Sequence, residues 1–500
     1  MKDNILEKIK KFQGNIKYNK FFTFLFFIIY LGLIIIVSSY HEAWEDESQA
    51  WLIARDLNFL DIIKQMRFEG HSFFWYYILA IFVKTGISYE FSKIIMIIIA
   101  MLTGIFILKK APYNNLVKIL ILFNSVFLYY LPVFLRPYAI SALMLIIISI
   151  MNEHPEKYPV LYGIVIAVLS NTHIIVLGIS FFIYLFFFKE QFLDKYNENT
   201  KNQNIKLILG AIIALSGMLI VMMCAVSGYI FSIAATHGSD VPEILLLRFI
   251  NYFKELFYII IGIKLPDFVI FIGYLIIVVS IIVQSIKVSR KQGIIFLFSL
   301  IFYLFIQIFI FGIFTNQRSI LPFIFLLYFS WNIKRDCINT KKIEILEIVI
   351  FTICVLSIPN TVKVISDEIK YPYNDSKNIA KYIEENIEEG SVFLTINWDS
   401  ISSVEVYLSG KDYRFYDATN NTYMTYAIWN KFLDKEKDSY IEDAIKNFEN
   451  EKIYIINLIS NDSDIMDLNS FRKSKEELEL LYSTNEKCLA RKAYLYKIKK

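Results

Sequence analysis

Long apolar runs alternate with short polar segments along the chain as far as residue 358. A helix needs about 20 mostly apolar residues to cross the hydrocarbon core of a membrane. The pattern therefore predicts a polytopic α-helical membrane protein. We expect eleven transmembrane helices, at residues 21–39, 91–108, 115–131, 138–151, 160–170, 173–188, 207–227, 268–286, 293–314, 319–332 and 343–358.

Lysine and arginine residues are unevenly distributed among the loops. They are concentrated before residue 21 and in every second loop after it, which is typical of cytoplasmic segments. This predicts a basic cytoplasmic N-terminus at residues 1–20 and a transmembrane domain at residues 21–358. The first apolar run has no evident small-residue cleavage site, so we expect it to be retained as a signal anchor.

Three parts of the apolar region have a less regular pattern. The segment Ser72–Thr85, in the first outer loop (40–90), is too short to cross and is expected to lie at the membrane interface. The outer loop 228–267 contains a second interfacial candidate, in which polar residues lie about one helical period apart. Residues 160–188 are expected to break into two short helices at Ser170–His173.

Residues 359–500 have the composition of a soluble domain, and an odd number of crossings places them outside the cell. We predict a small α/β domain that contains no nucleophile elbow, phosphate loop or zinc spacing. Its expected helices are Asp375–Gly390, Glu442–Glu451 and Lys473–Tyr482, and its expected strands are Ser391–Asn397, Lys452–Leu458 and Lys492–Ile498.

Composition supports the membrane interpretation and excludes some partners. The chain is 56% hydrophobic, and its formal net charge of +4 is spread over the loops. Without a basic domain, nucleic acid is not an expected partner, whereas membrane lipids are. The four cysteines show no metal or redox spacing. A bias toward Ile, Lys and Asn favours an AT-rich bacterial genome, hence a bacterial cell membrane.

The rare polar residues of the apolar region fall on the outer side of this topology. They are Asp46, Glu47, His71, Arg136, His173, His237 and Arg318. On a helix starting at Glu45, both Asp46 and Glu47 flank an apolar face, whereas Glu45 and Gln49 lie nearer the opposite one. A carboxylate in a poorly solvated groove would have a raised pKa suited to general base catalysis. Acids in the first turn of a helix also favour its dipole, which is the structural alternative.

The basic candidates also have two interpretations. Arg136 and Arg318 each begin a span, where an arginine either reaches the headgroups or binds an anionic ligand such as phosphate. His71 and His173 are either structural histidines or ligand contacts. Asp46, Glu47 and His71 together would suit a divalent metal, although their spacing is not specific for one.

Four short motifs occur in a recognisable order. They are Asp46-Glu47-Ser48-Gln49-Ala50-Trp51, Gly70-His71-Ser72, Arg136-Pro137-Tyr138-Ala139 and Arg318-Ser319-Ile320-Leu321-Pro322. The chain resembles the GT-C glycosyltransferases, nearest the protein-mannosyltransferase, aminoarabinose-transferase and RgtA/B/C/D-like enzymes. The resemblance covers about residues 20 to 360. It departs at Ser72, where many relatives have proline.

The resemblance implies inverting sugar transfer from a polyprenyl-phosphate carrier to a hydroxyl of a cell-envelope acceptor: a glycan, lipid, wall polymer or protein. Asp46 would be the catalytic base, and Glu47 would orient the acceptor or hold a metal or water. Arg136 and Arg318 would bind the donor phosphate. His71, Tyr138 and His173 would contact substrate.

Three other classes remain as alternatives. A lipid or polysaccharide transporter would usually place its binding groups near the midplane and show internal repeats, and the chain shows no repeat. A pyrophosphate-glycan ligase or polymerase also uses outward arginines, but does not need the acidic pair after the first span. A non-enzymatic scaffold or sensor would leave Asp46 and Arg318 without a role.

Overall fold

The structure is a computed structural model, and it describes residues 20–235, 254–262, 265–311, 316–337, 345–395, 401–418, 421–427, 445–448, 451–460 and 478–499. The chain divides into two compact units. We call Met1–Ile36, Ile94–Met223 and Asp240–Val364 the helical unit, and Val37–Lys93, Cys224–Ser239 and Ile365–Lys500 the mixed unit. Each unit is therefore built from segments that are far apart in the sequence.

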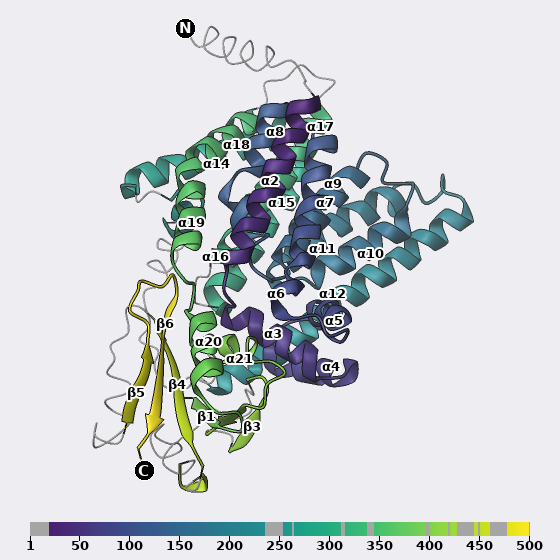
Figure 1. The fold of residues 1–500 in the computed structure, drawn as a ribbon. Helices are drawn as coiled ribbons and strands as arrows, with labels where there is room; N and C mark the ends of the chain where they lie inside the picture. Colours follow the sequence, from purple (N-terminus) through teal and green to yellow (C-terminus); the bar gives the residue numbers. More distant parts are fainter. Residues whose placement is uncertain are drawn as a thin grey trace. The chain divides into compact units, whose positions relative to one another are not determined.

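Helices form the helical unit throughout its described part (Figure 1). They are α2 (Lys20–Tyr40), α7 (Ile94–Lys110), α8 (Asn115–Leu122), α9 (Tyr138–Met151), α10 (Pro159–Ser170), α11 (Leu177–Phe188), α12 (Lys201–Ala235), α14 (Asp267–Lys287), α15 (Arg290–Phe305), α16 (Asn316–Ser319), α17 (Leu321–Cys337), α18 (Ile345–Leu356) and α19 (Ile358–Lys370). Short 3₁₀ or π turns join some of them, at Val126–Tyr130, Ile174–Val176, Lys189–Leu193 and Ile306–Phe311. The last residues of α2, α12 and α19 belong to the mixed unit.

Seven helical stretches in the described chain are long and apolar enough to cross a membrane. They are Phe21–Tyr40, Tyr89–Lys110, Ile174–Leu193, Lys201–Ser227, Asp267–Lys287, Arg290–Ile308 and Ile345–Lys370. Large apolar side chains such as Phe21, Leu219 and Phe271 are exposed on them, an arrangement favoured against lipid and not against water. The chain is therefore a membrane-embedded, mostly helical protein.

The other four predicted spans fall on shorter elements. The run 115–131 is divided between α8 and the turn Val126–Tyr130, while 138–151, 160–170 and 319–332 correspond to α9, α10 and α17. A helix of 12 residues such as α10 rises only about 18 Å, less than the ~30 Å hydrocarbon core. Eleven crossings therefore stay a prediction. The predicted break at Ser170–His173 is confirmed, because α10 ends at Ser170.

The mixed unit combines short helices with a sheet (Figure 1). Its helices are α3 (Glu45–Asp56), α4 (Phe59–Glu69), α5 (Phe74–Val83), α6 (Tyr89–Ser92), α20 (Ser376–Asn386) and α21 (Ser402–Glu405). Its strands are β1 (Val392–Thr395), β2 (Arg414–Asp417), β3 (Thr422–Met424), β4 (Ile453–Ser460), β5 (Leu478–Ser483) and β6 (Arg491–Ile498). Helix α3 packs against both α5 and α21, so segments from the two ends of the sequence share one unit.

The described strands form one sheet in the order β3-β2-β1-β4-β6-β5. Strand β1 is parallel to β2 and β4, and the remaining pairs are antiparallel. Apolar side chains of α20, among them Ile379 and Ile383, pack with Phe393, Phe415 and Tyr454 in one buried cluster. The predicted α/β character of this region, the helix over α20 and the strands over β1, β4 and β6 are confirmed.

Other expectations for the C-terminal region were wrong or lie outside the described residues. The predicted helix Lys473–Tyr482 is wrong over its described part, which is strand β5. The pairing of β5 with β6 explains this, because ladder hydrogen bonds override a weak helical preference. Strands β2 and β3 were not predicted. Half of the predicted helix Glu442–Glu451 lies outside the described residues, and so does most of the interfacial candidate in loop 228–267.

We expect Phe393→Ala to lower the free energy of unfolding of the mixed unit by about 3–5 kcal/mol, because it leaves a cavity in a packed core. The Phe393 ring is fully buried and stacks on Phe415 and Tyr454. Hydrogen exchange of the β1 amides in the full-length protein measures the change. Leu480→Ala, on the exposed side of β5, is the control, and equal exchange in the two variants would contradict the packing.

Candidate active site

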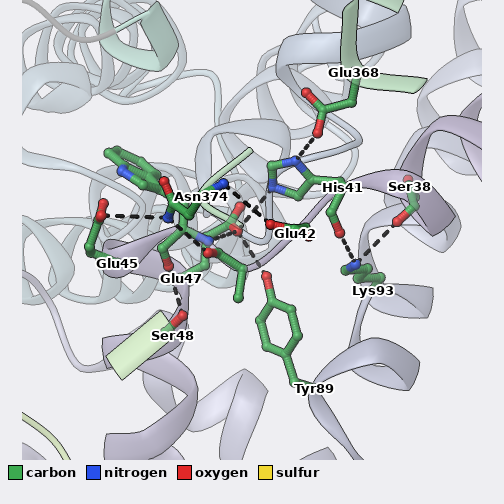
Figure 2. A network of polar contacts seen from close by, with 12 residues as sticks. Ser38, His41, Glu42, Glu45, Glu47, Ser48, Tyr89, Lys93, Glu368 and Asn374 are labelled. Carbon is green, nitrogen blue, oxygen red and sulfur yellow. Dashed lines mark hydrogen bonds and ion pairs between the residues drawn. The ribbon is translucent and has the colours of Figure 1, made fainter. Parts of the chain in front are cut away.

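A buried network of charged side chains begins directly after α2 (Figure 2). The imidazole of His41 lies between two carboxylates. Its Nδ1 is 2.7 Å from Glu368 Oε1, and its Nε2 is 3.1 Å from Glu47 Oε2. All three side chains are fully buried. We call His41, Glu47, Glu368, Tyr89 and Lys93 the His41 network.

The two carboxylates hold the imidazole in its charged form. Burial alone would lower the pKa of His41, but the charges of Glu47 and Glu368 and their hydrogen bonds raise it to about 9. Burial opposes ionisation of Glu47 as well, yet the ion pair with His41 outweighs it and lowers the pKa of Glu47. Both ring nitrogens of the imidazolium therefore donate to carboxylates.

Glu47 is also held by the N-cap residue of its own helix and by a side chain of α6. The Tyr89 hydroxyl donates to its Oε2 at 2.9 Å, and the Trp44 backbone N–H donates to the same oxygen at 3.1 Å. The Trp44 contact caps the N-terminus of α3, because Glu47 is the third residue of that helix. Glu47 thus links the start of α3 to His41 and to Tyr89.

Lys93 fixes the other side of the His41 segment. Figure 2 shows its ammonium group directed at two backbone carbonyls, those of Ser38 at 3.1 Å and His41 at 2.6 Å. The same group donates to Glu90 at 2.8 Å. These carbonyls lie at the C-terminal end of α2 and just beyond it, where unpaired carbonyl groups and the helix dipole favour a cation.

A second buried acid, Glu42, joins this region to the start of α20. Its Oε2 accepts from the backbone N–H groups of Asn374 at 3.3 Å and Ser376 at 3.2 Å. Burial, with the nearby charge of Asp375, raises the pKa of Glu42 to about 7 despite these hydrogen bonds. Glu42 therefore changes its charge near neutral pH, next to a helix N-terminus.

The three acids at the start of α3 have different surroundings. Glu47 is fully buried, whereas Asp46 is exposed. Glu45, predicted to face away, is buried and pairs with Arg491 at 3.0 Å. Gln49 is also buried, and its amide exchanges two hydrogen bonds of 2.8 Å with the backbone of Ala427.

Helical phase predicted that Glu45 and Gln49 lie away from the apolar face of α3, but it did not predict that both would be buried. Helical phase identified the apolar face around Ala50 and Ala54, which is buried. It could not show that C-terminal segments cover the opposite face, where α21 packs on α3. A poorly solvated carboxylate was expected at Asp46 and Glu47. Of the two, Glu47 is buried and Asp46 is exposed.

His41, Glu42 and Glu368 were missed by the sequence analysis. The available signal was the position of His41 and Glu42, which come directly after the first apolar helix and before the acids. Glu368 gave no such signal, because it lies 327 positions from His41. Only the folded mixed unit brings it to the imidazole.

His71 lies in the same unit, in the link between α4 and α5. It follows Gly70, whose φ of 67° ends α4 in the left-handed conformation. His71 is half-buried. No group of three or more His, Cys, Asp or Glu side chains within the described residues is arranged to hold a metal ion. The geometry therefore gives no support to a metal site at Asp46, Glu47 and His71.

The helical unit brings three other predicted residues together. The rings of Tyr138 and His173 stack with centroids 5.4 Å apart. The Arg136 guanidinium carbon lies 6.0 Å from the centre of the Tyr138 ring, within reach of a cation–π contact. All three are buried, and we call them the Tyr138 cluster. His173 Nδ1 accepts from the Ile175 N–H at 3.2 Å, so the histidine also caps the turn that follows it.

Arg318 lies at the end of the single turn α16 and is half-buried. The Tyr303 hydroxyl donates to its backbone carbonyl at 3.0 Å, which fixes the backbone at this position. Arg136 and Arg318 belong to the helical unit, and Asp46 and Glu47 to the mixed unit. The expected meeting of these arginines with the acids stays a prediction.

The chemistry that each cluster supports follows from its burial. Asp46 is exposed to solvent and lies beside Glu47, whose side chain is fixed by its hydrogen bonds. The Asp46 carboxylate can therefore approach a hydroxyl group of a molecule outside the protein. Glu47, fully enclosed and already accepting several hydrogen bonds, suits positioning and not proton exchange.

No family model, no curated protein and no solved structure matches the chain.

The raised pKa of His41 predicts a loss of stability at alkaline pH. A histidine whose pKa is raised on folding stabilises the protein fully below its ordinary value of 6.5, and that contribution disappears as the pH rises through about 9. We therefore expect the thermal midpoint of wild type to exceed that of His41→Gln by several degrees at pH 6, and the difference to shrink by pH 9.5.

Comparing the two proteins removes the effect of other buried acids. Burial raises the pKa of Glu42 to about 7 and that of Glu405 to about 8, so the ionisation of these two acids also destabilises the folded protein as the pH rises. His154→Gln is the matched control, since the side chain of His154 is exposed. A difference between wild type and His41→Gln that stays constant from pH 6 to 9.5 would refute the charged-imidazole interpretation.

Proposed function

We propose that the protein is an inverting glycosyltransferase that moves a sugar from a polyprenyl-phosphate carrier to an acceptor hydroxyl at the outer face of the bacterial cell membrane. The observation that carries this proposal is the pair formed by Asp46 and Glu47. One carboxyl group is presented to solvent on the first turn of α3, and its neighbour is locked by His41 and Tyr89.

Asp46 acts as the base in this mechanism. Its carboxylate removes the proton of the acceptor hydroxyl as the oxygen attacks the anomeric carbon of the sugar. The bond between that carbon and the phosphate oxygen breaks, and the polyprenyl phosphate leaves with the electron pair. Attack opposite the leaving group inverts the anomeric configuration.

Glu47 is a positioning residue in this proposal. A base is effective only when it is held near its reacting geometry. The contacts of Glu47 with His41, Tyr89 and the Trp44 N–H fix the first turn of α3, and Asp46 is part of the same turn. The His41 network would thus support the direction of the Asp46 side chain without meeting the substrate.

The donor phosphate would be bound by Arg136 and Arg318, whose guanidinium groups match phosphate geometry. The Tyr138 ring contacts Arg136 and His173 stacks on Tyr138, and both rings would contact the sugar or lipid. The positive charge would stabilise the phosphate as it leaves. His71 is a further candidate contact, and the acceptor is a glycan, lipid, wall polymer or protein of the cell envelope.

The proposal includes eleven crossings, a cytoplasmic N-terminus and an extracytoplasmic C-terminal region. It is supported by the uneven distribution of lysine and arginine between alternate loops. The short helices α9 and α10 would line a groove through which the lipid carrier enters from the side.

We expect Asp46→Asn to reduce sugar transfer by about 10²- to 10⁴-fold, the usual contribution of a positioned general base. The assay supplies radiolabelled polyprenyl-phosphate sugars to membranes that contain the protein, and measures label in the acceptor fraction. Asp61→Asn is the matched control, because Asp61 is also a carboxylate in the first turn of a helix of the mixed unit, α4.

Two outcomes would contradict different parts of the proposal. Full activity of Asp46→Asn would remove Asp46 as the base and leave the enzyme class intact. Absence of transfer by wild type from every carrier tested would reject the glycosyltransferase, and movement of intact glycan or lipid across the membrane would then favour a transporter.

The orientation can be tested by cysteine labelling. In a protein whose four native cysteines are replaced by serine, we expect His71→Cys to react with a membrane-impermeant thiol reagent in whole cells. Lys110→Cys, at the exposed end of α7, should react only after the cells are opened. The reverse result would invert the topology.

A further inference from the structure

A cavity of about 330 Å³ lies in the helical unit, away from the Tyr138 cluster. Its walls come from corresponding ends of several helices. Asn152 follows the last residue of α9, Glu190 follows α11, Lys291 is in the first turn of α15, and Arg335 is in the last turn of α17. Arg136 and Tyr138 lie at the other end of α9, about 20 Å away for a helix of this length.

The charged groups of the cavity favour an anion. Among the described residues that line it, Lys291 and Arg335 are cationic and Glu190 is acidic. Glu190 pairs with Lys291 at 2.5 Å, so the net charge of the lining is positive. A basic pocket of this kind between transmembrane helices is suited to an anionic headgroup, and a guanidinium beside it favours phosphate in particular.

The cavity wall also contains a buried polar atom to which no described residue donates a hydrogen bond. Gln292 is almost completely buried, and its side-chain oxygen has no hydrogen-bond partner within the described part of the chain. An unsatisfied buried amide oxygen destabilises the protein, and a ligand hydroxyl would remove that cost. If the amide is turned the other way, its N–H would instead donate to an anion.

The remaining wall is already rigid before any ligand binds. The Tyr162 and Phe187 rings stack with centroids 3.9 Å apart. The Tyr162 hydroxyl donates to Asn152 at 2.9 Å, and the Asn152 amide donates to Asn332 at 3.0 Å. A preformed pocket binds more tightly because little has to be ordered on binding. Its volume lies at the lower end of the ~300–1,000 Å³ typical of ligand sites, which suits a headgroup.

We propose that this cavity binds a phosphate ester that carries a free hydroxyl group. The phosphate would lie between Arg335 and Lys291, and the hydroxyl would meet Gln292. The lysine pattern places this end of the helices on the cytoplasmic side, where such a group occurs both in anionic phospholipids and in soluble phosphate esters. The site is independent of the sugar transfer proposed above.

The test measures binding of two probes to the full-length protein in a zwitterionic detergent. Dihexanoyl phosphatidylglycerol represents the lipid source, and glycerol 1-phosphate represents the soluble source. Dihexanoyl phosphatidylcholine, which has neither net charge nor free hydroxyl, is the reference. We expect at least one anionic probe to bind tighter than the reference. Binding of the lipid alone identifies a membrane headgroup, and binding of the soluble ester alone identifies a metabolite.

Three substitutions separate this site from general charge attraction. Arg335→Gln should weaken binding about tenfold, the effect of one charge-assisted hydrogen bond. Glu190→Gln should strengthen it severalfold, because it removes the acid from the lining. Arg290→Gln should leave it unchanged, since Arg290 is an exposed cation next to Lys291 that does not line the cavity.

Two results would overturn the proposal. One is the same affinity for the anionic probes and phosphatidylcholine. The other is a loss in Arg290→Gln that equals the loss in Arg335→Gln. If Arg335→Gln does not fold, Glu190→Gln still tests the proposal, because it is expected to strengthen binding.

Discussion

The buried imidazolium of His41 between Glu47 and Glu368 holds together parts of the mixed unit that local sequence does not connect. Three charged groups out of contact with water are stable only while all of them are present. Removing one partner of a buried ion pair leaves an uncompensated charge and costs about 3–5 kcal/mol. The arrangement therefore joins the end of α2, the start of α3 and the end of α19 through one buried side chain.

This constraint extends outward from the imidazole. Glu47 caps α3, Glu42 accepts from the first N–H groups at α20, and Lys93 closes the carbonyl end of α2. Each charge thus satisfies backbone groups at the end of a helix. The exposed Asp46 is an exception within an otherwise enclosed set of acids, which is why its role in transfer chemistry is the centre of the proposed function.

Much of the fold could be predicted because its signals are local. Apolar length revealed the long helices, and a break at Asn171 could be read from four polar residues in a row. The site was less predictable because its partners are distant. The sequence identified Asp46 and Glu47 as unusual acids. It did not reveal that their neighbours Glu45 and Gln49 are covered by Arg491 and Ala427, which are distant in the sequence. Strand β5 was mistaken for a helix because its pairing with β6 is invisible in a single segment.

The division of the mixed unit between distant parts of the sequence has a consequence for biosynthesis. His41 is made 327 residues before Glu368. At about 5–20 residues per second, its second carboxylate arrives roughly 15 to 65 seconds later. During that time the nascent chain contains His41 and Glu47 but not yet the C-terminal sheet. A chain that ends before residue 368 therefore lacks the second carboxylate partner of His41.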